Sequence, residues 1–444
     1  MLPQSQGPVV RTRFFNQAKG TRTASHYLFT PVDNPFVDVP IRLDEHEVSS
    51  PLAGRVAFVV GDSDADDKLP PAFAGDLFGR GIQTLFRNYL AGRDVGNGIA
   101  ALCDDKTFLH AVRRLTDTVY AAAMTRLGLD RIVDASLTNA RVIEVIRAVY
   151  PEAPIRDTEP IDPLPPFGPG GPRLSAPPLF IVGVPRSGTT WLENMLMAHP
   201  AIDGPGRETS IFVSLRALRD NLARPATVGL ARWIEPAELV AAMREFVDGL
   251  FAHYLATTGS TATRFLEKTP LHAEHLALIN EVFPDGAIIS VHRDGRDVVH
   301  SVLEMEAATD SVMVAASKWT DITRTVSEEF PRLPAARDER YEDVLRDPVA
   351  TMIDILAWLG LPATDEVVAE LRARAGVRVS QYNTTGDVGS GKWRSLSQRD
   401  LRGVYRYAGD RLVEAGYMSA DDLRRERSRP LYRIEQATRR VRRR

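Results

Sequence analysis

The sequence predicts an α/β fold in which a parallel sheet is flanked by helices in three layers, with an α/β extension at the N-terminus. Short apolar runs alternate with amphipathic segments from residue 179 onward, which is typical of a parallel sheet covered by helices. The first of these runs, 179–184, leads through a glycine-bearing turn into a segment with helical apolar spacing. These two observations define the fold class.

The elements follow along the chain in the order that such a sheet requires. Strands are expected at 179–184, 263–270 and 286–292, and helices at 189–200, 236–258, 272–284 and 297–305. Ligands of parallel sheets bind beyond the carboxyl ends of the strands. The loops after residues 184, 268 and 292 should therefore meet at one site.

A Pro- and Gly-rich stretch divides the 444-residue chain. It is predicted to be a linker, 151–178, between an N-terminal region, 1–150, and a larger domain, 179–420. The segment beginning at Arg131 aligns without gaps with the segment beginning at Arg264, so one hypothesis makes the N-terminal region a degenerate copy of the later pattern. Ala135 stands where the later segment has Lys268, so this copy should carry no active site.

The C-terminal tail, 421–444, is rich in arginine. Two interpretations stay open for it: a solvated helix with a frayed end, or a peripheral contact with an anionic surface.

Composition and charge argue against several classes of protein. A net charge of −3 does not indicate a nucleic-acid partner. The single cysteine, Cys103, excludes an intrachain disulfide and a cysteine-based zinc cluster. The first residues lack a signal-peptide pattern, and no apolar run approaches the roughly 18 residues that span a bilayer. A cytoplasmic protein is the expectation, and the oligomeric state is left open.

The turn GVPRSGTT has the glycine spacing of a phosphate-binding P-loop. Gly188 allows close backbone approach, and the following helix directs free N–H groups at an anion. Ser187, Thr189 and Thr190 add hydroxyl donors, and Arg186 adds a forked cation. Thr189 stands where nucleotide hydrolases need lysine, which argues against ATP or GTP hydrolysis.

A second candidate motif is VHRDGRDVVHSVL. Arg293 ends a predicted strand and Ser301 lies on the following helix, so the two could hold a second phosphate. Taken alone, an arginine in a surface ion pair and a solvent-facing serine would explain the same residues. Next to the P-loop motif, the phosphate clamp is the better interpretation.

These two motifs, together with HPAIDGPGRETSIF, EKTP and RYEDVLRDP, resemble the sulfotransferases that use 3′-phosphoadenosine 5′-phosphosulfate (PAPS) and release the bisphosphate PAP. The resemblance covers about residues 178–415 and is strongest toward a bacterial branch similar to tyrosylprotein sulfotransferases. It implies transfer of a sulfuryl group from PAPS to a hydroxyl or amine, with no metal required.

The resemblance also implies a set of nucleotide contacts. The 5′-phosphosulfate would be held by Arg186, Ser187, Gly188, Thr189 and Thr190, and the 3′-phosphate by Arg293 and Ser301. Trp191 and Tyr341 would lie near the adenine. A late loop, 389–397, would cover the 3′-phosphate with Lys392 and Arg394, although it lacks the family's usual Arg-Lys-Gly triplet.

Three further roles concern the chemistry. Arg186 and Lys268 would stabilise negative charge on the leaving oxygen. Glu208 would accept the proton of the acceptor, because GRETSIF matches the stretch that supplies a catalytic glutamate in the tyrosylprotein branch. His272 is the alternative base, since it lies near the same predicted strand end.

Other functions and the acceptor stay open at this point. A small-molecule kinase on the same P-loop scaffold is one alternative, and a non-catalytic PAPS-fold binding protein is another. The acceptor could be a small molecule, a glycan, a lipid or a peptide, because acceptor loops vary most.

Overall fold

The computed structural model describes residues 56–60, 77–93, 96–127, 132–137, 145–146, 148–150, 173–222, 234–305, 311–376 and 391–429. Its central element is a five-stranded sheet in the order β4-β5-β3-β6-β7, with every neighbouring pair parallel. The strands are β3 (Leu179–Gly183), β4 (Ile202–Asp203), β5 (Arg264–Lys268), β6 (Ala287–His292) and β7 (Ala336–Arg340). The predicted fold class is confirmed.

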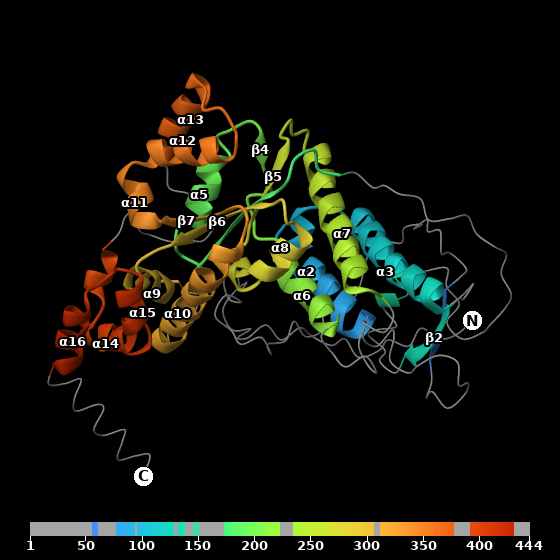
Figure 1. The fold of residues 1–444 in the computed structure, drawn as a ribbon, viewed down its shortest axis with the longest axis horizontal. Helices are drawn as coiled ribbons and strands as arrows, with labels where there is room; N and C mark the ends of the chain where they lie inside the picture. Colours follow the sequence, from blue (N-terminus) through green and yellow to red (C-terminus); the bar gives the residue numbers. More distant parts are fainter. Residues whose placement is uncertain are drawn as a thin grey trace, which may run out of the picture.

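Along each strand, successive side chains point to opposite faces of the sheet, so each face contributes to a different apolar cluster. In β3, Phe180 and Val182 belong to one apolar cluster, whereas Leu179 and Ile181 belong to another. The second cluster contains side chains of α5 (Thr189–Leu196), α12 (Pro348–Trp358) and α13 (Asp365–Ala375). The first contains side chains of α6 (Ile211–Leu222), α7 (Pro236–Thr257), α8 (Leu276–Val282), α9 (Gly295–Leu303), α10 (Val312–Glu329), α14 (Gln398–Tyr407) and α15 (Gly409–Glu414). The sheet is therefore the middle of three layers, and Figure 1 shows α12 and α13 on the side opposite α6 and α10.

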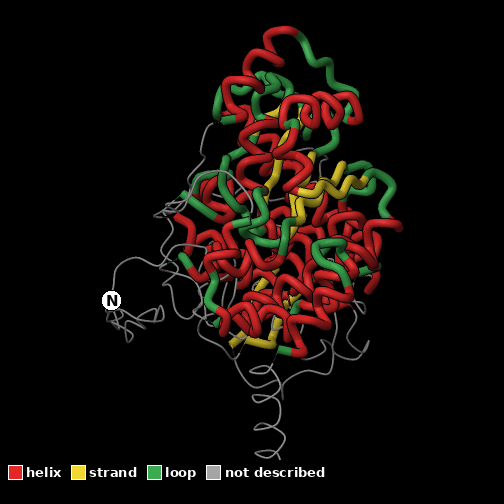
Figure 2. Tube along the Cα trace, turned by 90° about the vertical axis from the view of Figure 1, so that its left-hand side faces the viewer, coloured by secondary structure: helices red, strands yellow, loops and turns green. Residues whose placement is uncertain are grey.

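The shorter elements complete the described C-terminal part. They are η5 (Pro270–Glu274), η6 (Phe330–Arg332), α11 (Tyr341–Arg346), η7 (Lys392–Ser395) and α16 (Ala420–Ser428). In the perpendicular view of Figure 2, helices lie around the strands.

The helix expected over 272–284 is divided into η5 and α8. His275, between them, has φ of −131° and ψ of 26°, outside helical geometry. The side chain of His272 is bound to Glu267 at the end of β5, which fixes the 3-10 turn against the sheet. The local apolar pattern cannot show this tertiary contact, so it predicted one continuous helix.

The N-terminal region contributes helices to the same core as the sheet. Two helices, α2 (Gln83–Arg93) and α3 (Asp105–Leu127), pack on α6 and α7 respectively, and their buried side chains join the first apolar cluster. A π-helical turn, η2 (Leu77–Ile82), precedes α2, and a 3-10 turn, η3 (Gly98–Ala101), follows it.

A separate two-stranded sheet lies in the same region. It joins β1 (Val56–Val60) and β2 (Ile132–Leu137) in parallel, as β3 and β5 are joined in the central sheet. A strand thus follows Arg131, just as β5 begins at Arg264, which agrees with the alignment of these two segments. The degenerate-copy hypothesis and the domain limits stay predictions, and most of the linker and residues 430–444 of the tail lie outside the described residues. Within the described part, no helix has the length and apolar content needed to cross a bilayer.

Candidate active site

The P-loop links the end of β3 to the first turn of α5. Gly188 has φ of 101°, and a Cβ atom there would lie 2.4 Å from the ring of Tyr341. Only glycine tolerates both this conformation and this close contact. The hydroxyl of Ser187 is buried, and its oxygen has no hydrogen-bond partner among the described residues. A buried unsatisfied donor beside a helix N-terminus suits an anion.

The second motif meets the P-loop, as the sequence predicted. Arg186 Nε donates to Ser301 Oγ at 3.1 Å, and Arg293 Nη1 donates to the carbonyl of Arg186 at 3.3 Å. The guanidinium of Arg293 lies 4.9 Å from the ring centroid of Tyr341. These four residues, from the P-loop, the turn after β6, α9 and α11, form one cationic corner at the carboxyl edge of the sheet.

The late loop is attached to this corner through α9. Asp297 accepts hydrogen bonds from the backbone N–H groups of Gly391 at 2.6 Å and Trp393 at 2.8 Å. Arg394 donates to the carbonyl of Gly391 in its own turn, and its guanidinium lies 4.9 Å from the Trp393 ring. The contacts of Lys392 and Arg394 with a 3′-phosphate stay predictions.

Three ionisable side chains form a buried cluster at the end of β5, which we name the carboxylate–lysine cluster. Lys268 Nζ lies 3.6 Å from Glu193 Oε2 and 3.7 Å from Glu208 Oε1, and all three side chains are at most 6% exposed. Burial alone would lower the pKa of Lys268, but the two carboxylates raise it. The structure therefore brings the predicted base and the predicted lysine together.

Glu193 was missed by the sequence analysis. The helical spacing of the sequence could have indicated that Glu193 is buried. Position 193 falls on the same helix face as Thr189, Leu192 and Leu196, which are all buried. An acidic residue on a buried helix face needs a partner. Burial, the largest influence, raises the pKa of Glu193 to about 7, although Lys268 opposes it.

We expect Glu193 to give a distinct pH dependence to stability. Its pKa rises from 4.5 to about 7 on folding, so the stabilisation it provides is complete below pH 4.5 and is lost as the pH rises through 7. At about 1.4 kcal/mol per pKa unit, the loss is on the order of 3 kcal/mol. The difference in unfolding free energy between wild type and Glu193→Gln, from denaturant titrations, should fall by this amount over that range. A constant difference would contradict this prediction.

His272 is not available as a base, which corrects the alternative assignment. Its Nδ1 lies 2.8 Å from Glu267 Oε2, and its Nε2 accepts the backbone N–H of Phe212 at 3.2 Å. Glu267 Oε1 also accepts hydrogen bonds from Thr209 and Thr269 at 2.8 and 2.6 Å. Burial alone would raise the pKa of Glu267, but these interactions lower it. His272 is fully buried and both ring nitrogens are occupied, so its role is structural.

Three other residues expected to contact the nucleotide lie in the first turn of α5. Trp191 is buried in the second apolar cluster, and its Nε1 has no partner among the described residues. Thr189 is buried at the first position of α5, and Thr190 is partly exposed beside it.

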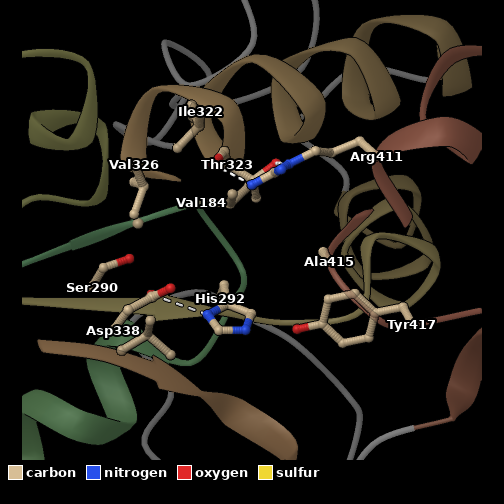
Figure 3. Close-up of a pocket in the computed structure, with 12 residues that line it drawn as sticks. Val184, Ser290, His292, Ile322, Thr323, Val326, Asp338, Arg411, Ala415 and Tyr417 are labelled. Atoms are coloured by element: carbon tan, nitrogen blue, oxygen red, sulfur yellow. Dashed lines mark hydrogen bonds and ion pairs between the residues drawn. The ribbon is translucent and has the colours of Figure 1, made fainter. Parts of the chain in front are cut away.

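A cavity of about 100 Å³ lies between the end of β3, strands β6 and β7, and helices α10 and α15 (Figure 3). Between β6 and β7, His292 Nδ1 is 3.0 Å from Asp338 Oδ1, and Arg411 hydrogen-bonds Thr323 across the cavity. None of the side chains predicted for the site lines it. We therefore give this cavity no part in the reaction.

Comparison with known proteins decides the family. Residues 177–366 match the sequence model described as the Sulfotransferase family. This segment belongs to the sulfotransferase family. The resemblance inferred from the motifs is thereby confirmed for the part of the chain that carries the P-loop, the carboxylate–lysine cluster and the Arg293 motif.

Curated relatives agree with this sulfotransferase segment. A protein-tyrosine sulfotransferase of Drosophila melanogaster is 29% identical over 221 residues, which cover 48% of this chain and 44% of the relative. Protein-tyrosine sulfotransferase 1 of Danio rerio is 27% identical over 223 residues, covering 48% of this chain and 61% of the relative. The chain thus spans about half the length of the curated relatives it matches. A solved sulfotransferase, STF9 of Mycobacterium avium, is 17% identical, with a TM-score of 0.35 and coverage of 53% of this chain and 77% of that one.

Proposed function

We propose that the protein transfers a sulfuryl group from PAPS to a hydroxyl or amine acceptor and releases PAP. One observation carries this proposal. The corner formed by Arg186, Arg293 and Ser301, which suits two phosphates, lies at the same sheet edge as the buried Lys268–Glu208 pair. Family membership of residues 177–366 supports the same chemistry.

The nucleotide would bind by charge-assisted hydrogen bonds at two points. The P-loop backbone, Ser187 and Arg186 would hold the 5′-phosphosulfate at the N-terminus of α5. Arg293 and Ser301 would hold the 3′-phosphate, the group that separates PAPS and PAP from ordinary adenine nucleotides. The expectation that no metal is required stays a prediction.

The chemical step would be an in-line displacement at sulfur. The acceptor oxygen forms a bond to sulfur while its proton passes to Glu208, and the bond from sulfur to the bridging oxygen breaks, leaving its electron pair on PAP. Lys268 and Arg186 stabilise the charge that develops on that oxygen. As in phosphoryl transfer, positioning and charge stabilisation do most of the work.

The names of the relatives suggest which class of acceptor to test first. The Drosophila and zebrafish relatives are named protein-tyrosine sulfotransferases, so a tyrosine peptide is the first acceptor to test. Small phenols, glycans and lipids belong in the same panel.

Calorimetric titration with PAP, 5′-AMP, ADP and Mg-ATP tests the nucleotide site. PAP should bind more tightly than the other three nucleotides. Its affinity should be the same with and without EDTA. Arg293→Ala should weaken PAP binding by about 2 kcal/mol, because a charged partner of the 3′-phosphate is lost. The exposed Arg346, paired with Asp343 on α11, provides a matched control, and Arg346→Ala should bind normally.

Three results would redirect the proposal. Equal wild-type affinity for PAP and AMP would remove the 3′-phosphate site, and a preference for Mg-ATP would favour the kinase alternative. Tight PAP binding with no cleavage of labelled PAPS in the presence of any acceptor of the panel, or of an extract of the source cells, would favour the non-catalytic alternative.

A further inference from the structure

The turn that carries Glu208 is held by residues outside the family segment 177–366. The backbone N–H of Gly98, the first residue of η3, donates to the carbonyl of Glu208 at 2.9 Å. Asn88 of α2 reaches the next two residues of the same turn. The N-terminal region thus contacts the main chain of the proposed base directly.

Asn88 joins three elements with one side chain. Its Nδ2 lies 2.8 Å from Ser214 Oγ, 3.0 Å from the carbonyl oxygen of Thr209 and 3.1 Å from that of Ser210. Its Oδ1 accepts the backbone N–H of Ile99 at 3.0 Å. The side chain therefore connects α2 and η3 to the turn that precedes α6.

The turn itself needs such support. Ser210 has φ of 51°, a left-handed conformation that is uncommon for residues other than glycine. From the opposite side, Ser210 N–H donates to Thr269 Oγ1 at 3.1 Å, just after β5. The strained residue is thus held between the N-terminal region and the end of the strand that carries Lys268. A strained backbone persists where its surroundings fix it, and such positions cluster at active sites.

The backbone of Gly98 lies directly against the side chain of Asn88. This glycine has φ of 61°, and a Cβ atom there would lie 2.3 Å from Asn88 Oδ1. Any other residue would displace the amide group that holds the turn. Two independent contacts, from Gly98 and Asn88, therefore converge on residues 208–210.

We propose that Asn88 is a positioning residue for the reaction, which with Gly98 holds the 208–210 turn so that the Glu208 carboxylate faces Lys268. Its catalytic consequence rests on the proposed function. The N-terminal region, which lies outside the family segment, then forms part of the active-site construction. Asn88 acts through Glu208 and touches no reacting atom.

The first test needs no substrate. In the full chain, Asn88→Ala should speed amide hydrogen exchange in residues 208–214 by about tenfold or more, because three contacts to this segment are lost. Thr107→Ala is the matched control: its hydroxyl lies 3.3 Å from His253 Nε2 and also joins the N-terminal region to α7, away from the turn. Exchange at 208–214 should be unchanged in this variant.

The second test measures cleavage of PAPS to PAP, with water as the acceptor if the panel offers none. Asn88→Ala should lower kcat about tenfold with little change in the KM for PAPS, since small misplacements of a reacting group are costly. The loss should disappear in a Glu208→Gln background, because two residues acting through one step are not additive. Thr107→Ala should keep the wild-type kcat.

If Asn88→Ala fails to fold, Asn88→Asp answers the same question. The carboxylate keeps the acceptor for Ile99 N–H but presents oxygen to the carbonyls of Thr209 and Ser210, so the same rise in exchange and loss of kcat is expected. The proposal would be overturned if the Asn88 variants had the same exchange rates and kcat as Thr107→Ala. It would also be overturned if the loss of kcat caused by the Asn88 substitution multiplied with the loss caused by Glu208→Gln in the double variant. A wild type that neither binds PAP nor cleaves PAPS would overturn the proposed function instead, and the exchange comparison would still decide whether Asn88 holds the turn.

Discussion

Replacing Lys268 with methionine should lower the turnover of PAPS by about 10³-fold while the affinity for PAP changes far less. The ammonium is fully buried at the carboxyl end of β5, where charge develops on the leaving oxygen in the proposed reaction. Methionine has nearly the same volume but removes the ammonium group, with its charge and its N–H donors. Steady-state rates and PAP calorimetry on the same preparation separate the two effects.

The same variant should also lose stability in a pH-dependent way. Glu193 and Glu208 lie 3.6 and 3.7 Å from Lys268 Nζ, so Lys268→Met leaves two buried carboxylates without this cation. Removing one partner of a buried ion pair costs about 3 to 5 kcal/mol. Glu193, whose pKa is raised by burial, relieves part of this cost by binding a proton. Unfolding free energy should therefore fall most at about pH 8 and least at about pH 5.

A folded control separates catalysis from stability. Lys318→Met removes a partly exposed lysine paired with Glu274 at 2.6 Å and should change turnover and stability little, as expected for a surface pair. If Lys268→Met, folded at low temperature, cleaves PAPS at the wild-type rate, the lysine has no part in charge stabilisation.

Local patterns predicted the central part of the fold well. The apolar run of β3 and the glycine turn after it lie next to each other in sequence, so P-loop and helix could be placed from residues 179–200 alone. The meeting of Arg186 with Arg293 also followed, because parallel strands direct their carboxyl ends to one edge.

Long-range contacts explain what the sequence analysis missed. His272 has the chemistry of a base, and only the positions of Glu267 and Phe212 in space show that both its nitrogens are occupied. Glu193 lies within an apolar helix, and its importance depends on Lys268 from a different strand. Asn88 belongs to a region with no motif, so its contacts with the turn after Glu208 could not be foreseen.

Replacing Glu208 with glutamine should lower turnover by about 10² or more and leave PAP affinity unchanged, because a general base commonly contributes this factor. The amide keeps the shape of the side chain but cannot accept the acceptor's proton. Glu274→Gln, on the surface beside Lys318, is the matched control and should turn over normally.

The pH dependence of the rate identifies the base only after Glu193 is taken into account. The pKa of Glu193 is raised to about 7, so its ionisation beside Lys268 adds a step to any rate profile near neutrality. The comparison therefore belongs in a Glu193→Gln background. There, Glu208→Gln should flatten the rising limb that a general base gives to a rate profile. Lys268→Met should lower the whole curve and keep that limb. A limb that survives Glu208→Gln would assign the proton to a group other than Glu208, and His272, with both nitrogens occupied, would not be that group.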